Sequence, residues 1–109
     1  MRLFGLTTCD TCRKAKKALV SDGYAPDFVD VRTDGIDRAT LERFHAEFGA
    51  DLLNRRSTTW RGLSESERAG APPDLIATHP ALMKRPVIEA DDGTLYLGWG
   101  RDVQAALLG

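Results

Sequence analysis

The chain has 109 residues, enough for one compact domain with a modest hydrophobic core. Its 42% hydrophobic and 28% charged residues are ordinary for a globular protein, and a formal net charge of −1 gives no overall attraction to nucleic acid. No stretch approaches the roughly 20 apolar residues of a membrane span, and the N-terminus lacks a signal-peptide pattern, so we expect a cytoplasmic protein with no membrane partner and no direct nucleic-acid partner.

The first third of the chain predicts a strand, a helix and a second strand. Residues 2–6 form a short apolar run typical of a strand, and a helix follows to about Ser21, with Asp10 or Thr11 as its expected N-cap. Residues 27–31 alternate apolar and acidic side chains, as a half-buried strand does. This order predicts a right-handed βαβ unit with two parallel strands.

The middle of the chain is predicted to be helical. Asp37 is the expected cap of a helix that ends near Gly49, and its buried face is expected to hold Leu41, Phe44 and Phe48. Further short helical segments are predicted at residues 51–53, after the capping-box pair Ser64 and Glu67, and over residues 72–83 with an interruption at Pro80.

The last quarter predicts a hairpin and a closing helix. Residues 86–98 hold two apolar runs around Asp92 and Gly93, which indicates a β-hairpin. Residues 101–108 predict a helix whose apolar face carries Val103, Ala106 and Leu107. The sequence therefore predicts a single α/β domain over residues 1–109, with helices flanking a four-stranded mixed sheet and a helical insertion in the middle. A Cys-x-x-Cys motif at the first strand-to-helix junction makes this a thioredoxin-like fold.

Cys9 and Cys12 are the only cysteines of the chain. Cys9 stands at the predicted start of a helix, where unpaired backbone N–H groups and the helix dipole stabilise a thiolate and lower its pKa. Cys12 shares a helix face with Ala15 and Leu19, so we expect it to face the sheet. These positions predict Cys9 as the attacking thiol and Cys12 as the shielded thiol that closes an intramolecular disulfide.

Two other interpretations of the cysteine pair remain open at this point. A structural zinc site needs four ligands, and only His45 and His79 could complete one, from distant elements. Free cysteines also pack in cores as small hydrophobic residues. Redox chemistry is favoured over both, and no metal is expected.

Three segments resemble a known family: CDTCRKAKKAL, LLNRRSTTWRGL and HPALMKRPVIEADDGTLYLGW. Together they are similar to the arsenate-reductase-like proteins of thioredoxin fold, the group that includes ArsC, Spx and YffB proteins. The resemblance covers nearly the whole chain and is strongest toward the YffB-like subgroup, whose members resemble glutathione-dependent thiol reductases. The two-cysteine motif itself is more similar to that of Spx-type regulators.

The resemblance implies roles for individual residues. Cys9 would be the nucleophile, Arg85 an anion-binding side chain beside it, and Pro86 a cis-proline that faces the cysteine loop. Arg56 matches a recurrent arginine of the YffB and Spx groups and would line the same cleft, whereas Trp60 is expected to pack the helical insertion. A guanidinium suits the proposed role of Arg85 because its fork binds a carboxylate or an oxyanion bidentately.

The sequence also departs from arsenate reductases. The hydroxyl-rich segment that follows the cysteine in those enzymes is replaced here by Asp10, Thr11 and Cys12. Two of their arginines fall at Asn54 and near Gly98, so that Arg85 alone remains of the set. Arsenate reduction is therefore not the first expectation.

Two functions of different classes follow from the resemblance. The first is a thiol-disulfide reductase that acts on a small thiol or disulfide, with no bound cofactor and with glutathione as co-substrate. The alternative is an Spx-type redox-sensing regulator that binds the RNA polymerase α subunit through the surface around Gly49. Regulators of this type usually carry a further C-terminal tail, whereas this sequence stops at Gly109. The enzyme is therefore the expected function.

Overall fold

The computed structural model describes all 109 residues, which form two compact units. The first unit combines residues 1–34 with residues 85–109, and the second consists of residues 35–84. The second unit is the helical insertion predicted from the sequence, and it enters the chain between the second and third strands. None of the helices is long and apolar enough to cross a membrane.

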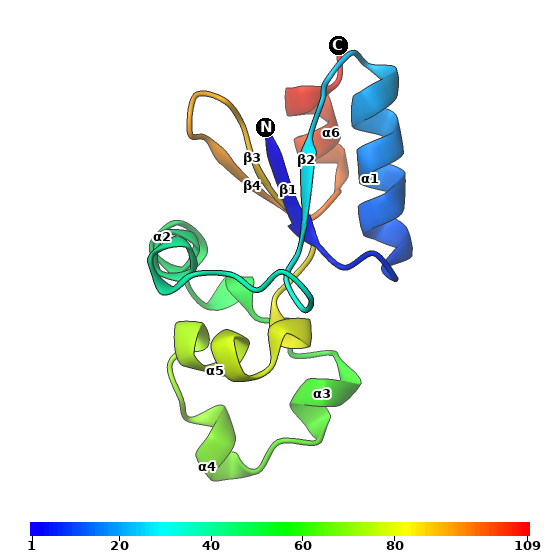
Figure 1. Ribbon diagram of the computed structural model, residues 1–109. Coiled ribbons are helices and arrows are strands. Elements are labelled where there is room, and N and C mark those ends of the chain that lie inside the picture. The colour runs from blue at the N-terminus through cyan, green and yellow to red at the C-terminus, as the bar shows by residue number, and fades with distance from the viewer. The chain divides into compact units, whose positions relative to one another are not determined.

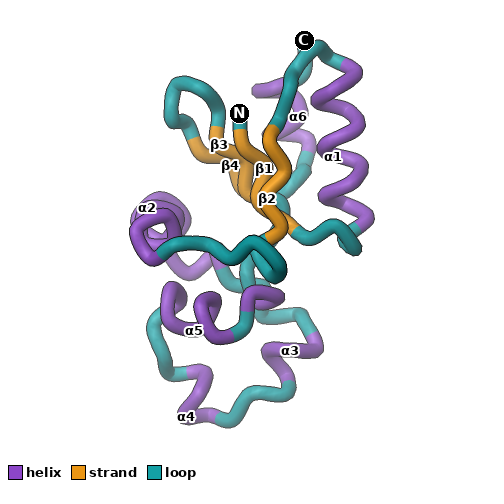
Figure 2. Tube along the Cα trace, viewed as in Figure 1, coloured by secondary structure: helices purple, strands orange, loops and turns teal.

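The first unit is built on a four-stranded mixed sheet, as the sequence predicts. Its strands lie in the order β2-β1-β3-β4 (Figures 1 and 2), with the bounds β1 Arg2–Gly5, β2 Asp27–Asp30, β3 Val87–Glu89 and β4 Leu95–Leu97. Strands β1 and β2 are parallel, whereas β3 runs antiparallel to both of its neighbours, β1 and β4. The late hairpin therefore places one strand inside the sheet and one at its edge.

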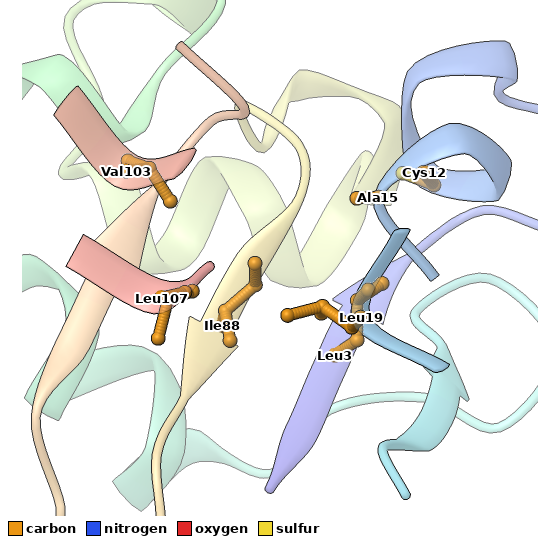
Figure 3. Packing of buried hydrophobic residues seen from close by; sticks show 7 residues of the cluster. All are labelled: Leu3, Cys12, Ala15, Leu19, Ile88, Val103 and Leu107. Atoms are coloured by element: carbon orange, nitrogen blue, oxygen red, sulfur yellow. The ribbon is translucent and has the colours of Figure 1, made fainter. Parts of the chain in front are cut away.

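Two helices, α1 (Asp10–Ser21) and α6 (Arg101–Leu107), pack on one face of this sheet. Leu3 and Ile88 lie opposite each other in neighbouring strands and supply the sheet side of the core. The helices contribute the apolar side chains that Figure 3 shows around them, namely Cys12, Ala15, Leu19, Val103 and Leu107. This is the packing that the spacing of apolar residues in both helices predicts.

The predicted apolar face of α6 needs one correction. Val103 and Leu107 are buried, but Ala106 is exposed. Residues four apart lie nearly above one another on a helix, so Val103 and Leu107 define the contact line of this two-turn helix. Ala106 falls to one side of that line, and the helix contacts the sheet too narrowly to bury it.

The second unit contains short helices, four of them α-helical. They are α2 (Arg38–Phe48), α3 (Thr58–Arg61), α4 (Glu65–Arg68) and α5 (Pro72–Thr78), with 3₁₀ turns η1 (Gly49–Leu52) and η2 (Pro80–Leu82). Two predicted caps are present: Asp37 accepts a hydrogen bond from the Thr40 N–H at 2.7 Å, and Ser64 forms a capping box with Glu67. Gly49 ends α2 with a φ of 58°, which favours glycine.

Helix α3 is the element that the sequence interpretation missed. Its signal is Ser57, whose hydroxyl accepts a hydrogen bond from the Trp60 N–H at 3.1 Å. This is an ordinary N-cap arrangement, but it starts a helix of only one turn, without an apolar periodicity to reveal it. The ring of Trp60 makes cation–π contacts with the guanidinium groups of Arg55 and Arg68, whose central carbons are 5.8 and 5.4 Å from its centroid.

Candidate thiol active site

The two cysteines lie at the point where β1 leads into α1. Cys9 is the N-cap residue of the helix, and its backbone is still extended, with φ −88° and ψ 120°. The prediction of Asp10 or Thr11 as N-cap is wrong by one or two positions, because the helix already begins at Asp10 and Cys9 is its N-cap. Asp10 instead forms an ion pair with Arg13 within the first turn. The cap position therefore belongs to the residue predicted as nucleophile.

The two thiols differ in burial as the sequence predicts. Cys9 is partly exposed, whereas Cys12 is fully buried against the sheet. The close approach of α1 to β1 at this point depends on Gly5, because an added Cβ at that position would overlap Sγ of Cys12. A glycine in a buried strand thus provides the space that the second cysteine occupies.

Replacement of Gly5 by alanine is expected to destabilise the protein. The extra methyl group would overpack the contact between β1 and α1, so we expect the free energy of unfolding to fall by about 1–3 kcal/mol. Chemical denaturation measures this change. Gly62→Ala is the matched control, because a Cβ there would meet its nearest neighbours at an ordinary 3.6 Å. Equal stability of the two variants would contradict the close packing of Cys12 on Gly5.

The surroundings of Cys9 favour its thiolate. Partial burial raises the pKa of the Cys9 thiol, but the backbone N–H of Cys12, the Cys12 thiol and the guanidinium of Arg85 together lower that pKa below its ordinary value. Cys12 of α1 and Arg85 of the segment before β3 therefore both favour the negative charge on this sulfur. A thiolate is the nucleophilic form of cysteine, so this arrangement gives Cys9 more reactive sulfur at neutral pH than a free cysteine has.

Cys12 is held in its neutral form. Burial raises the pKa of the Cys12 thiol to about 11; the backbone of Leu6 lowers this pKa, and the neighbouring Cys9 raises it. The two thiols thus have opposite tendencies although they are one helical turn apart. The environment therefore favours the thiolate at Cys9 and the neutral thiol at Cys12, while the predicted roles of attacking and resolving thiol stay predictions.

Arg85 and Pro86 directly precede β3, the strand that pairs with β1. The guanidinium of Arg85 lies close enough to Cys9 to lower the pKa of its thiol. The peptide bond between Arg85 and Pro86 is cis, and Pro86 is buried, so the implied cis-proline is confirmed. The structure therefore brings together Cys9, Cys12 and Arg85, and Pro86 follows Arg85 directly in the chain.

No group of three or more His, Cys, Asp or Glu side chains is placed to hold a metal ion. His45 lies partly buried in α2, and His79 caps the end of α5. Both histidines belong to the second unit, whereas the cysteines belong to the first. The two cysteines therefore have no third ligand within their own unit.

The amino-acid sequence, with its two cysteines at the start of α1, matches a known protein family. The sequence profile of the ArsC family fits residues 4–106. The chain belongs to the ArsC family. This confirms the resemblance of the three sequence segments.

Solved structures agree with this assignment. A YffB protein superposes on the chain with a TM-score of 0.87 and 37% identity, over 99% of this chain and 98% of that one. An arsenate reductase (ArsC) related protein from Brucella melitensis superposes with a TM-score of 0.74 and is 35% identical. The match covers 95% of this chain and 91% of that one. An arsenate reductase from Vibrio cholerae shares the fold, with a TM-score of 0.75 over 99% of this chain and 98% of that one. The two sequences are only 17% identical. The fold is thus thioredoxin-like.

One curated sequence is also similar over its whole length. It is an uncharacterized protein of Haemophilus influenzae that is 36% identical over 110 residues, covering 95% of this chain and 96% of the other.

Arg56 is the predicted site residue whose position relative to the cysteines stays a prediction. It lies in the second unit of this ArsC-family protein, exposed to solvent, and lines an open depression together with Arg55 and Lys84. Its backbone N–H donates to the side chain of Asn54 at 3.1 Å. The carboxylate of Asp51 also lines this depression, and the role of Arg56 rests on the family resemblance alone.

The sequence interpretation missed Asp30, the last residue of β2. Its carboxylate is buried and accepts hydrogen bonds from Thr7, two residues before Cys9. The available signal was an acidic residue at the C-terminal end of a parallel strand, close to a loop that carries a candidate nucleophile. From the sequence, Asp30 counts only as one of the acidic residues of an alternating strand, whereas the structure buries it and leaves Asp27 exposed.

Proposed function

We propose that this protein is a thiol-disulfide reductase that uses Cys9 as nucleophile and glutathione as reductant. The observation that carries the proposal is the pairing of two unlike thiols at the start of α1. The sulfur of Cys9 is partly exposed and faces the donors of Cys12 and Arg85, while the thiol of Cys12 is buried beside it. Membership of the ArsC family supports thiol-dependent chemistry.

In the first step the thiolate of Cys9 attacks one sulfur of a substrate disulfide. A mixed disulfide forms between Cys9 and that sulfur, the substrate S–S bond breaks, and the second substrate sulfur leaves as a thiolate. The step is a nucleophilic displacement, so the electron pair of the broken bond departs with the leaving sulfur. Arg85 beside Cys9 would bind an anionic group of the substrate at this stage.

In the second step Cys12 attacks the sulfur of Cys9. The mixed disulfide breaks, a Cys9–Cys12 disulfide forms, and the substrate leaves as a thiol that has taken up the proton of Cys12. Two glutathione molecules then reduce the Cys9–Cys12 disulfide and become oxidised glutathione. The reaction thus consumes two thiols of glutathione for each substrate disulfide reduced.

The charge on Cys9 affects when Cys12 can react, because it contributes to the pKa of the Cys12 thiol. Burial is the main reason for the raised pKa of Cys12, but the adjacent Cys9 raises that pKa further. Once Cys9 is joined to substrate, its sulfur carries no negative charge, and this contribution to the pKa of Cys12 disappears. The resolving thiol therefore becomes easier to ionise only after the first step has occurred.

The test is turnover of purified protein with glutathione, glutathione reductase and NADPH on a panel of small disulfides. We expect NADPH oxidation that depends on both the protein and the disulfide. Arsenate should give little activity, because the family resemblance places two arginines of arsenate reductases at Asn54 and near Gly98 of this chain. Absence of turnover with every disulfide would contradict the proposal. Redox-dependent binding of the RNA polymerase α subunit without any turnover would instead identify a regulator.

Oxidation with diamide is expected to join Cys9 and Cys12 in one disulfide. The two thiols already contact each other, and the first turn of a helix deforms at low cost because its N–H groups make no intrahelical bonds. Mass spectrometry after alkylation should show the loss of two hydrogens and no free thiol. Two alkylated cysteines after this treatment would favour a single-cysteine mechanism, in which glutathione itself resolves the mixed disulfide.

A further inference from the structure

The carboxylate of Asp30 is the most heavily hydrogen-bonded side chain near the thiol site. Its Oδ2 accepts from the backbone N–H of Thr7 at 2.9 Å and from the Thr7 hydroxyl at 3.0 Å. Its Oδ1 accepts from the backbone N–H groups of Arg32 and Thr33 at 2.9 and 3.0 Å. The carboxylate thus joins the loop before Cys9 to the turn after β2.

The surroundings keep Asp30 ionised although it is only 6% exposed. The donors of Thr7 and the backbone N–H groups of Thr33 and Arg32 lower its pKa far below the ordinary value for aspartate, against the opposing effect of burial. A buried carboxylate is tolerated when its oxygens are filled by donors, and here both oxygens are. The charge is therefore permanent over the pH range in which a thiol works.

The Asp30 contact acts on the loop that orients Cys9. Strand β1 ends at Gly5, which accepts a hydrogen bond from the Val31 N–H at 2.9 Å and so closes the pairing with β2. Two residues later Asp30 holds Thr7, and the Cys9 N–H then bonds back to the Leu6 carbonyl at 3.0 Å. Between the end of β1 and the start of α1, Thr7 is the residue fixed by a side chain from another strand.

We propose that Asp30 is a positioning residue of the thiol site, which holds the Cys9 loop through Thr7 so that the sulfur meets its donors. This inference rests on the proposed function and adds to it a residue that never touches substrate. The groups that face Cys9 itself are Cys12 and Arg85, and Asp30 acts on neither of them directly. Loss of the contact should let the loop drift and weaken the donors at the sulfur.

Thr7→Val tests the proposal with the least disturbance. Valine has nearly the same shape as threonine and keeps the backbone N–H bond to Asp30, but it removes the hydroxyl bond. We expect the rate of iodoacetamide alkylation of Cys9 at neutral pH to fall about threefold to tenfold, the factor that one ordinary hydrogen bond corresponds to. The pH at which the rate is half-maximal should rise. Thr7→Ser restores a hydroxyl and should restore both values.

Asp30→Asn is the stronger variant. An asparagine side chain offers one oxygen and one NH₂ group, so one of the two donor pairs would face another donor. The alkylation rate of Cys9 should fall further than in Thr7→Val. Asp34→Asn is the matched control, because Asp34 belongs to the same turn and accepts the Asp30 N–H at 2.9 Å but does not touch Thr7. It should alkylate like the wild type.

The outcomes separate this proposal from the proposed function. A lower melting temperature with an unchanged alkylation rate and pH profile, measured well below unfolding, would overturn the positioning role and leave a purely structural one. Equal effects of Asp34→Asn and Thr7→Val would overturn it as well. Absence of disulfide turnover in the wild type would refute the reductase function, while the alkylation readout would still decide the role of Asp30. Should Asp30→Asn fail to fold, the Thr7 pair alone decides.

Discussion

Replacement of Cys9 by serine is expected to reduce disulfide turnover to the uncatalysed level. A serine hydroxyl is not ionised at neutral pH and is a far weaker nucleophile toward sulfur than a thiolate. Cys12→Ser should retain the first step instead, because serine still offers a donor to Cys9, and should accumulate the mixed disulfide between Cys9 and the substrate. Coupled turnover and intact-protein mass spectrometry measure the two effects.

The roles of the two cysteines can be checked independently of any substrate. Alkylation with iodoacetamide across pH, followed by peptide mapping, should modify Cys9 first and at a lower pH than free cysteine. Cys12 should react slowly until strongly alkaline pH, because burial raises its pKa to about 11. Preferential modification of Cys12, or full turnover by Cys9→Ser, would reverse or remove the assignment.

Replacement of Arg85 by alanine should weaken reaction with anionic disulfides about tenfold to a hundredfold more than with neutral ones. The guanidinium lies beside the sulfur of Cys9, and hydrogen bonds to charged groups contribute about 1.5–3 kcal/mol. Part of the loss should be common to both substrates, because Arg85 also lowers the pKa of Cys9. Rates measured at a pH where Cys9 is fully ionised isolate the part that depends on substrate charge.

Two further variants define what Arg85 does. Arg85→Lys keeps the positive charge but loses the bidentate fork, so its rate with anionic disulfides should lie between those of wild type and alanine. Lys17→Ala removes an exposed positive charge from α1 and should change neither substrate much. Equal losses on anionic and neutral disulfides, after full ionisation of Cys9, would remove the substrate-binding role. A collapse of the melting temperature would make Arg85 a structural residue.

The fold could be predicted from the sequence wherever one local pattern decides the outcome. The alternation of residues 27–31, the spacing of Cys12, Ala15 and Leu19, and the turn at Gly93 each identify their element correctly. The strand directions could be predicted because two strands joined by a crossover helix are parallel and the strands of a hairpin are antiparallel, whereas the order β2-β1-β3-β4 was not predicted. The predictions that were wrong or missing concern single residues or one helical turn: the N-cap of α1, the burial of Ala106 and the one-turn helix α3.

The candidate site was predicted in part, for two different reasons. Cys9 and Cys12 could be assigned from helix position alone. Arg85 and Pro86 required the family resemblance, because they lie far from the cysteines in sequence and only the pairing of β3 with β1 brings them near. Asp30 was missed because its importance comes from a contact between the end of β2 and Thr7 in the loop after β1, which no periodicity encodes.

The order of the strands has a consequence for how the protein matures during synthesis. Strand β1 pairs on one side with β2, which follows soon after, and on the other with β3, which arrives only in the last quarter of the chain. A nascent chain that has emerged as far as the helical insertion can already present Cys9 on α1, but it still lacks Arg85. Contacts between such distant segments also form slowly. The growing polypeptide therefore carries both thiols before it acquires the guanidinium of Arg85, which is one of the groups that lower the pKa of Cys9.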